Sequence, residues 1–231
     1  MKKHNIILIL VLILIFLFSN VSYATENKSI LILLDELNFQ DIERILHDDN
    51  FGIGFMNLRT RRPHGDESLY FSIATGRKVG VNSDHYKGLY KNKDGTIKVV
   101  GFEDMLKDLT KRTNNIKVDI LGEKLKVEGI SYIGDRSSAI IAADKNGNIK
   151  SGEIEINYDE KWLKEKTKDH LSNSNILVLS YEIDETKHRI ELLEKYIDEF
   201  EDYNIIIVPN KVSQEMKYIL NKNLVPIIYV N

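Results

Sequence analysis

Cysteine is absent from this chain of 231 residues. Its absence excludes disulfide bonds, thiolate nucleophiles and metal sites with cysteine ligands. The chain also lacks a large excess of either charge, since 32 lysines and arginines stand against 35 aspartates and glutamates. A net charge of -3 without a basic stripe creates no field that would attract nucleic acid. We therefore expect no nucleic-acid partner.

Long apolar runs are also lacking, except at the N-terminus. Lys2 and Lys3 precede an apolar run over residues 6–18, and Ser22-Tyr23-Ala24 supplies the small residues that a signal peptidase reads. The run is shorter than the roughly 20 apolar residues of a comfortable membrane span. The pattern predicts a signal peptide over residues 1–24 and an extracytoplasmic protein, secreted or held at the outer face of the cytoplasmic membrane. The alternative is an uncleaved anchor, which would be the one membrane contact.

The remaining residues, 25–231, have the size of a single domain with a sizeable core. Aliphatic strands alternate with helical patterns along them, beginning with a strand at residues 30–34 and ending with one at 225–230. Helices between successive strands are typical of a parallel sheet with right-handed crossovers. We therefore predict an α/β fold with a mostly parallel central sheet and helices on both faces.

The middle of the chain follows a different pattern, which predicts a small hairpin-containing insertion between about Gly88 and Ile156. Asp94-Gly95 and Asn146-Gly147 are strong signals for tight turns between paired strands. One predicted partner strand covers residues 139–142. Between the two turns we expect a helix at residues 102–111 and a strand at residues 116–121.

Polar residues follow three of the predicted strands. They are Asp35, the segment from Glu182 to His188, and Asn210. Because parallel strands present their carboxyl ends together, we expect Asp35, Asp184 and Asn210 at one edge of the sheet. Asp184 and His188 are four residues apart in a predicted helix, a spacing that lets a carboxylate and an imidazole bind one divalent ion. The alternative is a helix N-cap followed by a solvated histidine.

Taken together, these segments resemble the alkaline phosphatase superfamily. The resemblance rests on Asp35, on the stretches at residues 71–77 and 181–188, and on a Gly-x-Met-Asn-x-Arg-Thr stretch that begins at Gly54 and is shared with bacterial exported proteins. It implies a two-metal site for phosphate or sulfate transfer. Asp35, Asp184 and His188 would be metal ligands for zinc or manganese, and Asp66 or Ser68 would occupy the position of the nucleophile.

The chain departs from the family pattern in two places. Where the family carries an Asp-His pair after a later strand, this sequence has Pro209-Asn210-Lys211. The family's last metal-binding histidine would fall beyond Asn231, so we expect a C-terminally short chain that holds one divalent metal at most. His64 and His85 could replace missing ligands, although either could equally be a surface histidine.

Two functions remain open at this point. The first is a non-catalytic, alkaline-phosphatase-like domain that binds a ligand or partner through a degenerate active site. The second is a metal-dependent hydrolase of phosphate or sulfate esters. Three basic residues, Arg59, Arg61 and Arg62, could hold an anionic substrate or simply form a solvated loop. The missing Asp-His pair favours the first function.

Overall fold

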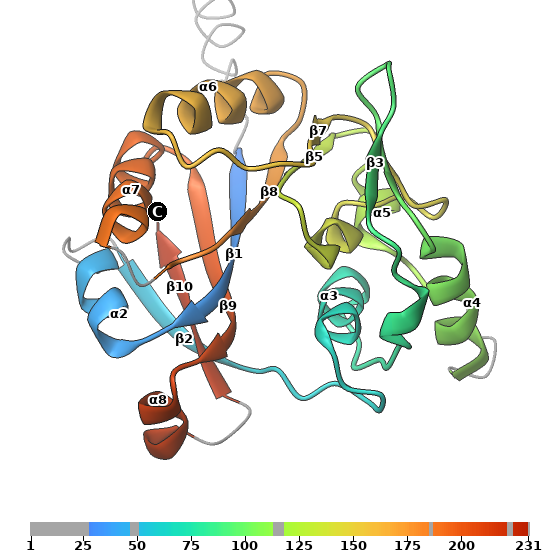
Figure 1. The fold of residues 1–231 in the computed structure, drawn as a ribbon, viewed down its shortest axis with the longest axis horizontal. Coiled ribbons are helices and arrows are strands. Elements are labelled where there is room, and N and C mark those ends of the chain that lie inside the picture. Colours follow the sequence, from blue (N-terminus) through green and yellow to red (C-terminus); the bar gives the residue numbers. More distant parts are fainter. Residues whose placement is uncertain (1–27, 47–50, 113–117, 185–186, 221–223, 231) are drawn as a thin grey trace, which may run out of the picture.

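The computed structural model describes residues 28–46, 51–112, 118–184, 187–220 and 224–230. It shows an α/β fold in which helices flank a seven-stranded sheet (Figure 1). The predicted signal segment, residues 1–24, lies outside the described residues. Within the described ranges, none of the helices combines the length and the apolar character needed to cross a membrane.

The main sheet has the strand order β2-β10-β9-β1-β8-β5-β7. The strands are β1 (Ser29–Leu37), β2 (Phe51–Asn57), β5 (Ile130–Ile133), β7 (Gly152–Glu153), β8 (Ile176–Tyr181), β9 (Asn204–Val212) and β10 (Leu224–Val230). From β9 to β7 all neighbouring strands are parallel, whereas β10 is antiparallel to both β9 and β2. The prediction of a mostly parallel sheet is therefore confirmed.

The direction of β10 corrects the prediction of parallel crossovers throughout. The link between β9 and β10 has eleven residues, 213–223, and its described part, 213–220, contains the short helix α8 (Gln214–Ile219). A parallel crossover needs a connection of about a dozen residues or more that passes over the sheet. The link is too short for that path, so the chain turns back and β10 runs antiparallel beside β9.

Two hydrophobic layers cover the sheet. Helices α2 (Phe39–Ile45), α6 (Glu160–Leu171) and α7 (Lys187–Glu199) lie on one face, and α3 (Asp66–Thr75) lies on the other (Figure 1). Side chains of β1 alternate between the layers, because successive residues of a strand point to opposite faces. Ile32 packs with the α6 and α7 layer, while Leu33 packs with α3. This alternation also directs Asp35 toward the α3 side.

The middle of the chain forms a second, three-stranded sheet of β3 (Leu89–Lys91), β4 (Ile97–Val99) and β6 (Asn148–Ile149). The predicted hairpin at Asp94-Gly95 is confirmed by the antiparallel pair β3–β4. Helix α4 (Phe102–Arg112) also lies where the sequence predicts it.

Three predictions for this region are wrong. Residues 139–142 do not form a strand, because they lie in or next to a buried 3-10 helix, Ser137–Ile141. A short apolar run alone cannot distinguish a buried strand from a buried helical segment. No strand lies at residues 118–121, where helix α5 (Leu121–Lys124) begins, and residues 116–117 are outside the described part. The region is also not a separate insertion, since β5 and β7 belong to the main sheet. A further 3-10 helix covers Ser83–His85.

Candidate functional site

The predicted convergence at one edge of the sheet is confirmed. The parallel register of β1 and β9 places Leu34 opposite Pro209, so Asp35 and Asn210 are neighbours across the two strands. On the other side of β1, the Oδ1 atom of Asp35 accepts a hydrogen bond of 2.9 Å from the amide of Ile183, which follows β8. The segment that contains Asp184 therefore reaches the same edge.

The predicted metal pair has a different geometry from the one expected. Asp184 itself lies outside a helix, whereas His188 lies within α7, so the two residues do not both belong to one helical face. The Oδ2 atom of Asp184 instead lies 3.1 Å from Nε of Arg189. His188 is exposed in the first turn of α7.

Arg136 is a cation among the acidic residues of this edge. It follows β5, and its guanidinium group lies 2.9 Å from Oε1 of Glu182. Although partial burial opposes the charged form, the negative charges of Glu182, Asp35 and Asp135 raise the pKa of Arg136. The acidic groups are thus balanced by an arginine of the chain itself.

A second arginine binds the segment after β8. The Nη1 atom of Arg189 lies 3.0 Å from Oε2 of Glu182, and its guanidinium group stacks at 3.7 Å from the ring centroid of Tyr158. The hydroxyl of Tyr158 accepts a hydrogen bond of 3.0 Å from the amide of Glu182. Together with its ion pair to Asp184, Arg189 holds this segment against the body of the domain.

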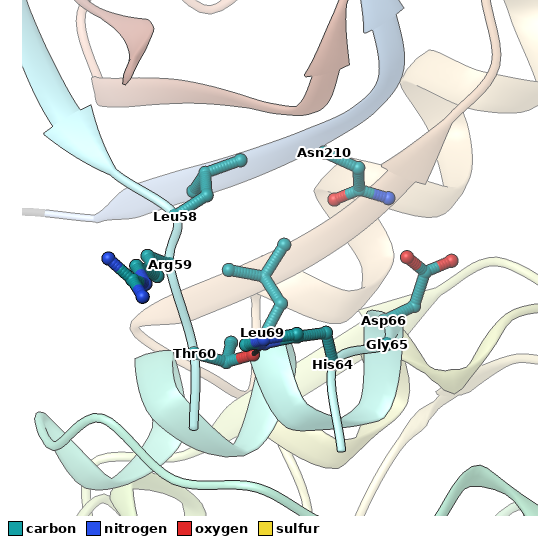
Figure 2. Close-up of a pocket in the computed structure, with 8 residues that line it drawn as sticks. All are labelled: Leu58, Arg59, Thr60, His64, Gly65, Asp66, Leu69 and Asn210. Atoms are coloured by element: carbon teal, nitrogen blue, oxygen red, sulfur yellow. Dashed lines mark hydrogen bonds between the residues drawn. The ribbon is translucent and has the colours of Figure 1, made fainter. Parts of the chain in front are cut away.

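A pocket of about 260 Å³ opens beside this edge, between the loop after β2 and the start of α3 (Figure 2). Its lining is mixed, with apolar, cationic and hydrogen-bonding side chains from three segments. The residues are Leu58, Arg59, Thr60, His64, Gly65, Asp66, Leu69 and Asn210. The pocket therefore joins the edge of the sheet to the predicted nucleophile region.

Asp66 begins helix α3 and turns its carboxylate to the same side as Asn210 (Figure 2). The residue has exposed surface, yet the partial burial of its carboxyl group raises its pKa, and the charge of Glu67 adds to this effect. Arg136 and Lys211 act in the opposite direction. Since all these groups influence Asp66, its carboxylate belongs to the charged cluster around Arg136.

Ser68 does not face the pocket. Its side chain is fully buried, and its Oγ atom lies 2.7 Å from the carbonyl oxygen of Pro63 and 3.1 Å from that of Val81. The same atom accepts a hydrogen bond of 2.9 Å from the amide of Val81. Its hydroxyl fastens two loops to α3, and this geometry favours Asp66 over Ser68 at the predicted nucleophile position.

Asn210 connects the sheet to α3. Its Nδ2 atom donates a hydrogen bond to the hydroxyl of Tyr70. Burial raises the pKa of Tyr70, as does the nearby charge of Asp66. The Oδ1 atom of Asn210 is buried and has no hydrogen-bond partner among the residues that the structure describes. Asn210 also lines the pocket.

The two candidate replacement histidines lie in different parts of the fold. The Nδ1 atom of His64 lies 3.1 Å from Oγ1 of Thr60 at the wall of the pocket. His85 lies in a 3-10 helix and interacts electrostatically with Asp108. Of the three arginines in the loop, Arg59 lines the pocket.

No group of three or more histidines and carboxylates is placed to hold a metal ion, as far as the described ranges extend. The paired acids can accept hydrogen bonds and ion pairs, but they do not converge on one point as metal ligands do. Comparison with known proteins adds no relative, because neither a protein-family model nor a curated protein matches the chain.

Proposed function

We propose that this protein is a non-catalytic, exported domain of the alkaline-phosphatase-like type, which binds a ligand at the edge of its sheet. The observation that carries the proposal is the position of Arg136. A cation of the chain lies among Asp35, Asp66 and Glu182, where a two-metal enzyme needs a cluster of acids free to bind metal. An arginine neutralises charge but cannot activate water or polarise a substrate as a metal does.

The pocket suggests the class of ligand. Arg59 offers a cation for a phosphate or sulfate group, and Asn210 lines the pocket with an amide side chain, a group that can hydrogen-bond a hydroxyl group. Leu58 and Leu69 provide apolar contact. A small hydroxylated phosphate or sulfate ester fits this combination, bound without being cleaved.

The test uses glycerol phosphate as the probe. We expect saturable binding by calorimetry that weakens at least about tenfold in Arg59→Ala, which corresponds to about 1.4 kcal/mol. Lys126→Ala is the control, since Lys126 is an exposed cation outside this pocket. Equal binding by both variants, or no binding by the wild type, would contradict the ligand class.

The hydrolase alternative makes a different prediction. Robust hydrolysis of phosphate monoesters or diesters that requires zinc or manganese would favour it, provided that Asp35→Asn and Asp184→Asn abolish turnover. On our proposal, the wild type hydrolyses these esters no faster than the two variants do. Transition-state charge in this chemistry is neutralised by metal ions, whereas Glu182 and Asp184 are paired with arginines.

A further inference from the structure

Strand β2 ends the main sheet on one side. It pairs with β10 along its whole length, from Phe51 opposite Val230 to Asn57 opposite Leu224. Among the described strands, none pairs with the other side of β2. That side presents unpaired backbone N–H and C=O groups, which are a template for a further strand.

This edge has none of the usual protections. Natural edge strands carry proline, charged residues or bulges that prevent pairing with another chain. The residues of β2 are Phe-Gly-Ile-Gly-Phe-Met-Asn, without proline or charge. Ile53 is 52% exposed and Phe55 is 60% exposed, although both are large and apolar.

The exposed side chains continue a buried row of the core. Ile207 in β9 and Ile228 in β10 lie opposite each other and are fully buried. Ile53 lies opposite Ile228 in the next strand of the same row. The row therefore ends at the edge strand with Ile53, an apolar side chain that is about half exposed.

The two glycines of β2 are not required by the fold of one chain. A Cβ atom at Gly54 would meet nothing within 4 Å, and one at Gly52 would make only ordinary contacts with Tyr229. Glycine weakens a strand interior and often marks a place where another backbone approaches closely. Both observations point to an occupant beyond the chain itself.

We propose that the occupant is β2 of a second copy, in an antiparallel pair with two-fold symmetry about Gly54. In this register Gly54 faces Gly54 of the partner, and Ile53 faces Phe55 of the partner. Ile53 of each copy then packs against Phe55 of the other copy. The strand is therefore complementary to itself, as a two-fold interface requires. The apolar row described above continues into the second sheet.

The interface is expected to be weak. One pair of seven-residue strands buries less than the roughly 1,200 Å² at the lower limit of a standard stable interface. We therefore expect a dimer that forms in a concentration-dependent way. Sedimentation velocity of the purified protein, from micromolar to near-millimolar concentration, measures this directly.

The first test introduces a charge. Phe55→Lys should weaken dimerisation at least about tenfold, because the ammonium group would face Ile53 of the partner. Val127→Lys is the control, since Val127 is 93% exposed in a different part of the fold. A wild type that stays monomeric throughout, or a dimer that persists in Phe55→Lys, would overturn the proposal.

The second test fixes the register and uses the absence of cysteine from the chain. Gly54→Cys should form a disulfide-linked dimer under mild oxidation, because the two residues 54 face each other. Gly52→Cys is the matched control on the same strand, since its partner in this register is Met56. Equal cross-linking of both variants would show that another register or another surface holds the copies together.

Discussion

Ser68 provides the sharpest test of the site geometry, through the variant Ser68→Ala. The change removes a buried hydroxyl and leaves the amide of Val81 and the carbonyl of Pro63 without this partner. An unsatisfied buried polar group costs about 1 to 3 kcal/mol. For a domain of this size each kcal/mol lowers Tm by about 2 to 4 °C, so we expect a fall of roughly 2 to 12 °C.

Thermal and urea unfolding followed by circular dichroism measure this effect. Ser83→Ala is the matched control, because Ser83 is exposed in the 3-10 helix on the same side of the fold. We expect glycerol phosphate to bind Ser68→Ala as it binds the wild type at temperatures where both are folded. An unchanged Tm together with lost binding or lost turnover would refute the structural role and restore Ser68 as a reacting group.

Three further predictions concern the charged cluster and the pocket. Arg136→Gln should lower the free energy of unfolding by up to about 1 kcal/mol, because Arg136 is partly exposed; urea unfolding at low and high salt should show a smaller loss at high salt. Asp66→Asn should be more stable than the wild type at neutral pH, and this difference in the free energy of unfolding should disappear in acid. Because the pKa of Asp66 is raised in the folded state, the wild type loses stability as pH rises through that pKa, whereas the amide of the variant cannot ionise. An opposite pH trend in unfolding experiments would contradict the burial of this carboxyl group. Asn210→Ala should change the free energy of unfolding by no more than about 1 kcal/mol, because it removes both a hydrogen bond to Tyr70 and an unsatisfied acceptor. A larger loss of stability, measured by urea unfolding, would show that the Oδ1 atom has a partner.

The parallel core of the fold could be predicted from the sequence because its strands are continuous aliphatic runs. Residues 30–34 and 176–179 read as buried strands, and they pair in the main sheet. The direction of β10 could not be predicted from its own residues. It depends on how far the connection after β9 can reach, which is a property of the whole sheet.

The convergence of Asp35, Asp184 and Asn210 was also predictable, since each lies near or just after the carboxyl end of a parallel strand. Arg136 was missed because its strand was missed. Residues 130–133 form a four-residue strand between Gly129 and Gly134, too short for a periodic signal. Had that strand been recognised, Arg136 would have been predicted at the same edge of the sheet as Asp35.

The role of Ser68 could not be read from the sequence. A serine two residues into a helix looks like a candidate nucleophile, and only the path of the loops around Pro63 and Val81 shows that its hydroxyl is buried. The helical spacing of Asp184 and His188 failed for a related reason. Asp184 itself is not helical, and a spacing of four residues brings two side chains to one face only when both residues lie inside a helix.

On our proposal, arginines of the chain, and not metal ions, neutralise the acids at the edge of the sheet. Calorimetric titration of the purified protein with zinc and with manganese tests it most directly. We predict no saturable binding at neutral pH that depends on Asp35 or Asp184. The exposed acidic control is Asp119→Asn. Our proposal would be contradicted if either metal bound stoichiometrically to the wild type and to this control but not to Asp35→Asn or Asp184→Asn.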